Sequence, residues 1–254
     1  MVTIEQKDQY TIDDLRQIMA LLRAPDGCPW DRVQTHASIR RNMIEEAYEA
    51  VDAIDRSDRT DMIEELGDVL MQVVFHAQIA AEDGAFAFDD VVDGVCRKLI
   101  FRHPHVFGPQ SAADDREAIA DWEAQKKIEK TQKTQTDSMR SVPRMMPALI
   151  RSAKIQEKSA RSGLDWPNAD AALADAAAQI DALRTAQPSD SARRAHLGRL
   201  LFAAVGAVRL SGAEPEELLT RTTDAYIDAF AQAEPQLETA APRTPDALLA
   251  DSAR

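Results

Sequence analysis

Apolar residues recur at helical spacing over two long consecutive segments, and this pattern constrains the fold more than any other feature of the chain. The first segment runs from about His36 to Arg56 and the second from about Arg59 to Glu82. Only a polar joint at 56–58 separates them, so we expect the second helix to turn back on the first as an antiparallel hairpin. The apolar faces that predict these helices consist of Ile39, Met43, Ala47, Val51 and Ile54, and of Met62, Leu66, Val69, Val73 and Ile79.

The remainder of the chain also predicts helices, so the expected fold class is all-α. Aromatic residues make up only 5% of the 254 residues and there are only 9 glycines, which favours helices over turn-rich β architectures. A capping-box pattern, Thr11 followed by Asp14, opens a first helix that the Pro-Asp-Gly sequence at 25–27 ends. Further helices are predicted at about 88–101, 144–161, 169–186, 190–210 and 214–230.

An internal similarity relates the two halves of the chain. Residues 65–80 align without gaps on residues 196–211, and the two segments share a Leu-Gly pair and most apolar positions. We therefore expect two related antiparallel helical-bundle units. The predicted organisation is a helical unit at 1–110, a charged helix and linker at 111–142, a second helical unit at 143–235 and a disordered tail at 236–254.

Charge and composition exclude several classes of partner. A net charge of −13 and a pI near 4.8 oppose nonspecific binding to nucleic acid, because the long-range field repels a polyanion. No stretch approaches the ~18 consecutive apolar residues of a membrane span, and the polar N-terminal residues form no signal core. Cys28 and Cys96 lack the spacing and density of a disulfide framework. We therefore expect a cytoplasmic protein that binds neither nucleic acid nor membrane.

The chemically distinctive residues are two pairs of carboxylates on the predicted hairpin. Glu46 and Glu49 lie one turn apart on the first helix, and Glu65 and Asp68 lie one turn apart on the second. Four carboxylates brought together would repel one another unless cations bridge them, and oxygen ligands at this spacing suit Mg²⁺ or Mn²⁺.

An ordinary solvated acidic face is the competing interpretation of these residues. Two features argue against it: the acidic residues stand next to apolar core positions, and Gly67 interrupts the second helix where close approach of a neighbour or ligand would explain it. A di-iron bundle is excluded as an alternative, because its Glu-x-x-His pattern is absent from the chain. For His76 we expect local packing or capping.

The pattern Glu46-x-x-Glu49, fifteen residues, Glu65-x-x-Asp68 resembles the ExxE…ExxD motif of the MazG superfamily of all-α NTP pyrophosphohydrolases. The resemblance extends from about residue 11 to 232. It includes GCPWDRVQTHASIR at 27–40, KLIFRHPHVFG at 98–108 and the segment PALIRSAKIQEKSARSGLDWP at 147–167.

The resemblance implies an enzyme that hydrolyses NTPs or dNTPs to the monophosphate and pyrophosphate, and that acts as a homodimer. It implies that Mg²⁺ is held by Glu46, Glu49, Glu65 and Asp68, while Glu45 and Glu64 complete the acidic lining and one of them positions or deprotonates the attacking water.

Four further residues match family features that contact the substrate. Lys98 and Arg102 match a Lys-x-x-x-Arg pair that offsets phosphate charge, and Trp122 and Lys126 match a Trp-x-x-x-Lys feature near the nucleotide. The Trp122 indole could stack on a base, or it could anchor an otherwise polar helix.

The second unit departs from the family pattern at every charged position. Its counterparts to the motif residues are Ala178, Gln179, Ala182, His196, Arg199, Ala225 and Ala229. We therefore expect activity only in the first unit, with the second unit packing, dimerising or regulating. The alternative is a nucleotide-binding or scaffolding protein that keeps the fold but turns over slowly or not at all.

Overall fold

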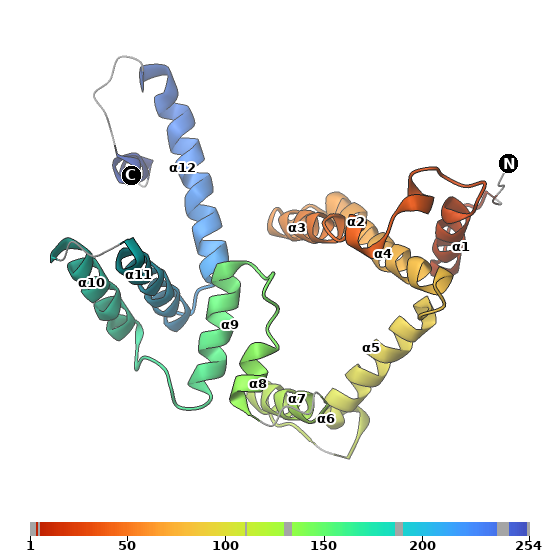
Figure 1. The fold of residues 1–254 in the computed structure, drawn as a ribbon, viewed down its shortest axis with the longest axis horizontal. Coiled ribbons are helices and arrows are strands. Elements are labelled where there is room, and N and C mark those ends of the chain that lie inside the picture. Colours follow the sequence, from red (N-terminus) through yellow and green to blue (C-terminus); the bar gives the residue numbers. More distant parts are fainter. Residues whose placement is uncertain are drawn as a thin grey trace. The chain divides into compact units, whose positions relative to one another are not determined.

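The computed structural model describes residues 4, 6–109, 111–129, 134–185, 190–237 and 244–252, and this part of the chain is helical with no strand (Figure 1). The prediction of an all-α fold is therefore confirmed. The chain divides into two compact units, Met1–Gln125 and Lys126–Arg254. Among the described residues, no helix has the length and apolar character needed to cross a membrane.

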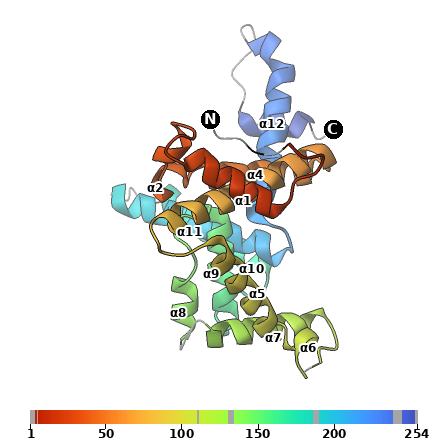
Figure 2. The ribbon, with the colours of Figure 1, turned by 90° about the vertical axis from the view of Figure 1, so that its right-hand side faces the viewer.

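The first unit is built around a long helical hairpin. Its helices are α1 (Ile12–Arg23), the 3-10 turn η1 (Asp31–Val33), α2 (His36–Ile39), α3 (Asn42–Asp55), α4 (Arg59–Glu82), α5 (Phe88–Arg102) and α6 (Pro104–Phe107), and α7 (Asp115–Glu129) begins in this unit. Helices α3 and α4 pack side by side, and α1 lies against α4 (Figure 2).

Local sequence signals set the ends of these helices. Thr11 and Asp14 form the predicted capping box, in which the Asp14 carboxylate accepts from the Thr11 amide at 2.8 Å. The Asp58 side chain caps α4 by accepting from the backbone amides of Thr60 and Asp61. Between α3 and α4, Ser57 adopts a left-handed backbone with φ of 55°, which closes the joint and turns the second helix back on the first.

The predicted helix at 36–56 is two helices. The Thr35 side chain accepts from the Ser38 amide and starts α2, which ends at Ile39, and α3 begins three residues later. Ile39 is only 1% exposed, so it fixes the position of α2. The sequence pattern did not show this break, because the apolar spacing continues across it.

The hydrophobic core of the first unit lies between α1, α2 and the second half of α4. It consists of Met19, Ile39, Val74, Phe75 and Ile79, with Leu15, Met71 and Phe88 packed against it. By contrast, the apolar residues of α3 and of the first half of α4 are largely exposed: Val51 is 52% exposed and Leu66 is 51% exposed. The carboxylate end of the hairpin therefore lies outside the core of its own chain.

The second unit contains a hairpin with the same order of packed helices. Its helices are α8 (Gln135–Arg140), α9 (Ala148–Ala160), α10 (Ala169–Thr185), α11 (Asp190–Leu210), α12 (Pro215–Leu237) and α13 (Pro245–Ser252). Helix α10 packs on α11 as α3 packs on α4, and α9 packs on α11 as α1 packs on α4. Arg209 at the end of α11 pairs with Asp165 at 2.5 Å.

Two segments of the second unit differ from the sequence-based expectations. Part of the predicted linker at 111–142 forms α8, which starts at a capping box of Thr134 and Asp137 and packs against α9. Within the predicted disordered tail at 236–254, α12 continues to Leu237 and Pro245–Ser252 forms α13. Pro245 suits the first position of a helix, and the Thr244 hydroxyl accepts from the Ala247 amide. The rest of that tail, 238–243 and 253–254, lies outside the described residues.

Candidate active site

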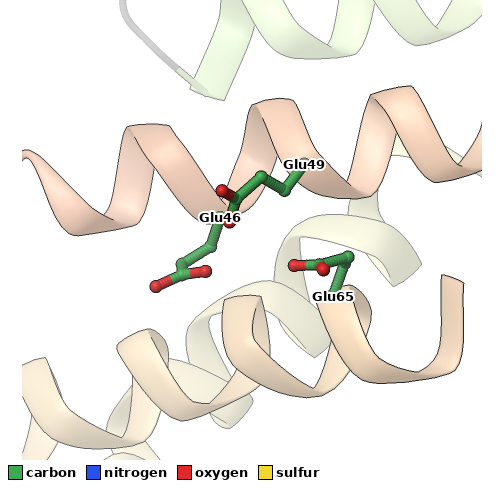
Figure 3. A group of neighbouring side chains, drawn as sticks. All are labelled: Glu46, Glu49 and Glu65. Atoms are coloured by element: carbon green, nitrogen blue, oxygen red, sulfur yellow. The ribbon is translucent and has the colours of Figure 1, made fainter. Parts of the chain in front are cut away.

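The α3–α4 hairpin brings three of the four predicted metal-binding carboxylates together. Glu46 and Glu49 extend from α3 and Glu65 extends from the facing side of α4 (Figure 3). One carboxylate oxygen of each lies within 4.8 Å of the others. Glu46 and Glu65 are half-buried, while Glu49 is exposed and leaves the cluster open to solvent on one side.

Charge repulsion acts on this cluster. Partial burial raises the pKa of Glu46, and the negative charges of Asp68 and Glu49 raise it further. Partial burial likewise raises the pKa of Glu65, with contributions from Glu49 and Asp68. Asp68 lies outside the group of three, but its charge raises the pKa of both Glu46 and Glu65. The charged groups behind these two shifts are all acidic, so a cation placed among them would relieve the repulsion.

The donor set suits a hard divalent cation. All candidate ligands are carboxylate oxygens, which Mg²⁺ and Mn²⁺ prefer, and no histidine or cysteine belongs to the group. The group is also the only one of its kind among the residues that the structure describes.

Gln72 is a neighbour of the cluster that the sequence analysis missed. It lies one turn after Asp68 on α4 and is 3% exposed. Its amide nitrogen points to the Glu46 carboxylate at 3.5 Å, and its amide oxygen is buried without a partner among the described residues. Its spacing from Glu65 and Asp68 was the available signal, because residues 65, 68 and 72 share one face of a helix.

Comparison with known proteins places these residues in a family. The model of the MazG nucleotide pyrophosphohydrolase domain matches residues 34–107. A nucleoside triphosphate pyrophosphohydrolase of Escherichia coli K12 is 40% identical over 228 residues, which cover 88% of this chain and 87% of that protein. This chain belongs to the MazG family.

Two further relatives are similar to most of this chain. A Thermotoga maritima protein named nucleoside triphosphate pyrophosphohydrolase/pyrophosphatase MazG is 38% identical over 226 residues, covering 89% of this chain and 86% of that protein. The uncharacterized protein YabN of Bacillus subtilis is 40% identical over 228 residues, and there the chain spans only 46% of the relative's length.

The two other acidic residues predicted for this MazG site lie beside the cluster. Glu45 forms a 2.7 Å ion pair with Arg41, one turn earlier on α3, and both side chains are exposed. Glu64 is exposed on α4, where its charge contributes to the raised pKa of Glu65. Exposed ion pairs of this kind are weak, so the pair with Arg41 leaves Glu45 able to turn to another partner.

Gly67 does not mark a close contact within the chain. A Cβ atom added there would meet no atom within 4 Å, and the position is exposed. The sequence-based argument that a neighbour or ligand approaches Gly67 therefore finds no partner within a single chain.

The predicted phosphate-binding residues, Lys98 and Arg102, lie on another helix of the first unit. Helix α5 leaves the end of α4 and extends away from the α3–α4 hairpin (Figures 1 and 2). Near its far end, Lys98 is exposed and Arg102 is 6% exposed, with the Arg102 guanidinium 5.1 Å from the centre of the Trp122 ring. Lys126 follows Trp122 by one turn on α7 and begins the second unit.

His76 pairs with His36, although it is 40 residues away in the sequence. The two Nδ1 atoms lie 2.8 Å apart and the rings are stacked, so one nitrogen must donate and the other accept. Burial lowers the pKa of His76, and His36 lowers it further. The contact joins α2 to α4 two turns beyond Asp68, as packing rather than as part of the carboxylate group.

The second unit places neutral or basic groups where the first has acids. His196 Nδ1 lies 2.8 Å from Gln179 Oε1, so a side-chain hydrogen bond joins α10 and α11. Arg199 is exposed one turn later. Among the described residues of this unit, no carboxylate group suited to a metal is present.

Proposed function

We propose that this protein is a Mg²⁺-dependent nucleoside triphosphate pyrophosphohydrolase whose active site lies in the first unit. The observation that carries the proposal is the convergence of Glu46, Glu49 and Glu65 within 4.8 Å, with Asp68 close enough to act on two of them. The names of the Escherichia coli and Thermotoga maritima relatives support the same reaction. Mn²⁺ is a possible substitute, because it accepts the same oxygen ligands.

The acidic residues of the site would have two roles, metal binding and activation of water. Glu46, Glu49, Glu65 and Asp68 would hold the metal, which when bound neutralises the triphosphate and stabilises the developing charge. Water would attack a phosphorus atom, and the bond to the leaving pyrophosphate would break. Either Glu45 or Glu64 would orient the water and take its proton, since both are exposed beside the cluster.

Cationic and aromatic groups would hold the nucleotide. The Lys98 ammonium and the Arg102 guanidinium would bind phosphate oxygens, and Trp122 and Lys126 would lie near the base. Because α5 extends away from the α3–α4 hairpin, these groups would complement the carboxylates of a second copy of the chain.

The direct test measures the products of the wild-type protein. With a panel of NTPs and dNTPs and excess Mg²⁺, we expect pyrophosphate and nucleoside monophosphate in equal amounts, and no release when a chelator removes the metal. Inorganic phosphate as the first product would contradict the pyrophosphohydrolase assignment. Metal-dependent nucleotide binding without any product would instead support the alternative, a nucleotide-binding or scaffolding protein.

The exposed apolar residues of the hairpin support a homodimer. On α3 they are Ile44, Tyr48, Val51 and Ile54, and on α4 they are Ile63, Leu66 and Leu70. Each set recurs at helical spacing, so each helix presents an unpaired apolar stripe of the kind that marks an association surface. A second copy would bury both stripes by a symmetric contact.

A charge placed on this stripe should separate the dimer. We expect the wild type to sediment at twice the 28.1 kDa mass of the chain and Val51→Glu to sediment at or near 28.1 kDa, because a buried unpaired carboxylate is costly. Asp26→Asn, at an exposed position in the loop after α1 and outside both helices, is the control and should remain dimeric. A wild type that sediments as a monomer at micromolar concentration would reject the homodimer.

A further inference from the structure

A small cavity lies between α6 and α7, at the C-terminal end of α5. Its volume is about 180 Å³, and its lining consists of His103, His105, Ala118, Ile119 and Trp122. Pockets for whole drug-sized ligands are larger, at roughly 300–1,000 Å³. The cavity therefore suits one planar ring system rather than a complete nucleotide.

Hydrogen bonds within the first unit already occupy one of the two histidines. His103 follows the last residue of α5, and its Nδ1 atom lies 2.6 Å from the carbonyl oxygen of Leu99 in the last turn of that helix. The His105 ring stands edge-on to His103, with centres 5.6 Å apart. Its Nδ1 is buried without a partner, and no described residue hydrogen-bonds its Nε2. Buried polar atoms are nearly always paired, so an unpaired imidazole in a cavity wall points to a ligand.

The surroundings of the cavity favour an uncharged ring attached to phosphate. Apolar and aromatic groups form most of the lining, and none of the lining residues carries a fixed charge, so a phosphate group has no counter-charge inside. Arg102 lies against Trp122 with its guanidinium 5.1 Å from the ring centre, and Lys98 is one turn earlier on α5. A ring held in the cavity would therefore place its phosphates beside these cations.

We propose that a ring nitrogen of His105 hydrogen-bonds the edge of the substrate's nucleobase and so determines base preference. A neutral imidazole offers one donor and one acceptor, so it can meet either a ring nitrogen or an exocyclic group of a base. The inference rests on the proposed function, since it takes the nucleoside triphosphate as the ligand. It adds a specificity-determining residue on α6 to the carboxylates of the hairpin.

The test compares His105→Phe with His105→Asn on ATP, GTP, CTP and UTP, with inorganic triphosphate as a ligand without a base. Phenylalanine keeps an aromatic ring and removes both nitrogens, whereas asparagine keeps a polar group near the Nδ1 position. We expect His105→Phe to lower kcat/KM for the preferred nucleotide about tenfold, the effect of one hydrogen bond. The preference among bases should shrink, and inhibition by triphosphate should not change. His105→Asn should restore part of the preference.

Controls separate recognition from folding and from the proposed function. Ile119→Val changes the same cavity without changing a polar atom, so it should affect all four nucleotides alike. Equal losses for every nucleotide and for triphosphate in His105→Phe, or an unchanged base preference, would overturn the inference. If the wild type hydrolyses none of the nucleotides, the proposed function fails. In that case, equilibrium binding of the same ligands tests whether His105 recognises the base. Equal binding by the wild type and by His105→Phe would reject the role of His105.

Discussion

Replacing Glu46 with glutamine is expected to lower Mg²⁺-dependent pyrophosphate release by at least about 10²-fold, because a bound metal contributes several kcal/mol of transition-state stabilisation. Glutamine keeps the size of the side chain and its contact with Gln72, but it removes the negative charge of one carboxylate of the cluster. Glu46 is half-buried and faces both Glu49 and Asp68. Steady-state kcat/KM with the best nucleotide gives the measurement.

The loss should come from the metal site and not from unfolding. Mg²⁺ is expected to raise the melting temperature of the wild type by mass action and to leave that of Glu46→Gln almost unchanged. Asp55→Asn, which removes an exposed carboxylate from the same helix, should keep both activity and metal stabilisation. Full activity in Glu46→Gln would reject the first-unit carboxylates as the active site.

The same variant should change how stability depends on pH. Burial and the neighbouring carboxylates raise the pKa of Glu46 above its ordinary value of 4.5, so between the two values the folded metal-free protein binds more protons than the unfolded chain. Without metal, this residue therefore favours folding increasingly as the pH falls through its raised pKa, and the contribution is complete below 4.5. Glu46→Gln should remove that part of the trend. With Mg²⁺ the trend at this site should reverse, because protons compete with the metal.

The sequence predicted the geometry of the hairpin well because the relevant signals are local. The polar joint at 56–58 and the Asp58 cap specify a tight reversal, and helical spacing then places Glu46 and Glu49 opposite Glu65. Each inference needs only the period of a helix and the length of a turn. The break between α2 and α3 was missed because apolar spacing alone cannot distinguish one helix from two in line.

The sequence pattern did not predict contacts between distant parts of the chain. The stacking of His36 on His76 depends on where α2 packs, which periodicity does not specify. Gln72 was overlooked because a buried glutamine looks like any polar residue in a sequence. The pattern also assigned Val51 and Leu66 to the apolar faces of their helices, and both are more than half exposed in the chain. Periodicity identifies an apolar face but not the molecule that covers it.

Arg102 is a buried basic residue that lies against an aromatic ring. It is 6% exposed and its guanidinium lies over the Trp122 ring at 5.1 Å, so a flat, delocalised cation fits this position better than a compact ammonium. If it also binds phosphate, it links the charge of the triphosphate to the cavity that contains His105. A guanidinium can hold two phosphate oxygens through parallel N–H bonds from two nitrogens, a fixed geometry that the single nitrogen of lysine does not offer.

Arg102→Ala is therefore expected to lower kcat/KM for nucleoside triphosphates about 10²-fold and Arg102→Lys about tenfold, since lysine restores charge without the fork or the ring contact. Arg97→Ala is the matched control, because Arg97 lies on the same helix but is exposed and pairs with Asp93 at 2.6 Å. It should change activity less than about twofold. Arg102→Lys with wild-type kinetics would show that charge alone suffices. Losses that track the melting temperature, with Mg²⁺ and triphosphate binding unaffected, would instead make Arg102 a packing residue of α5 and α7.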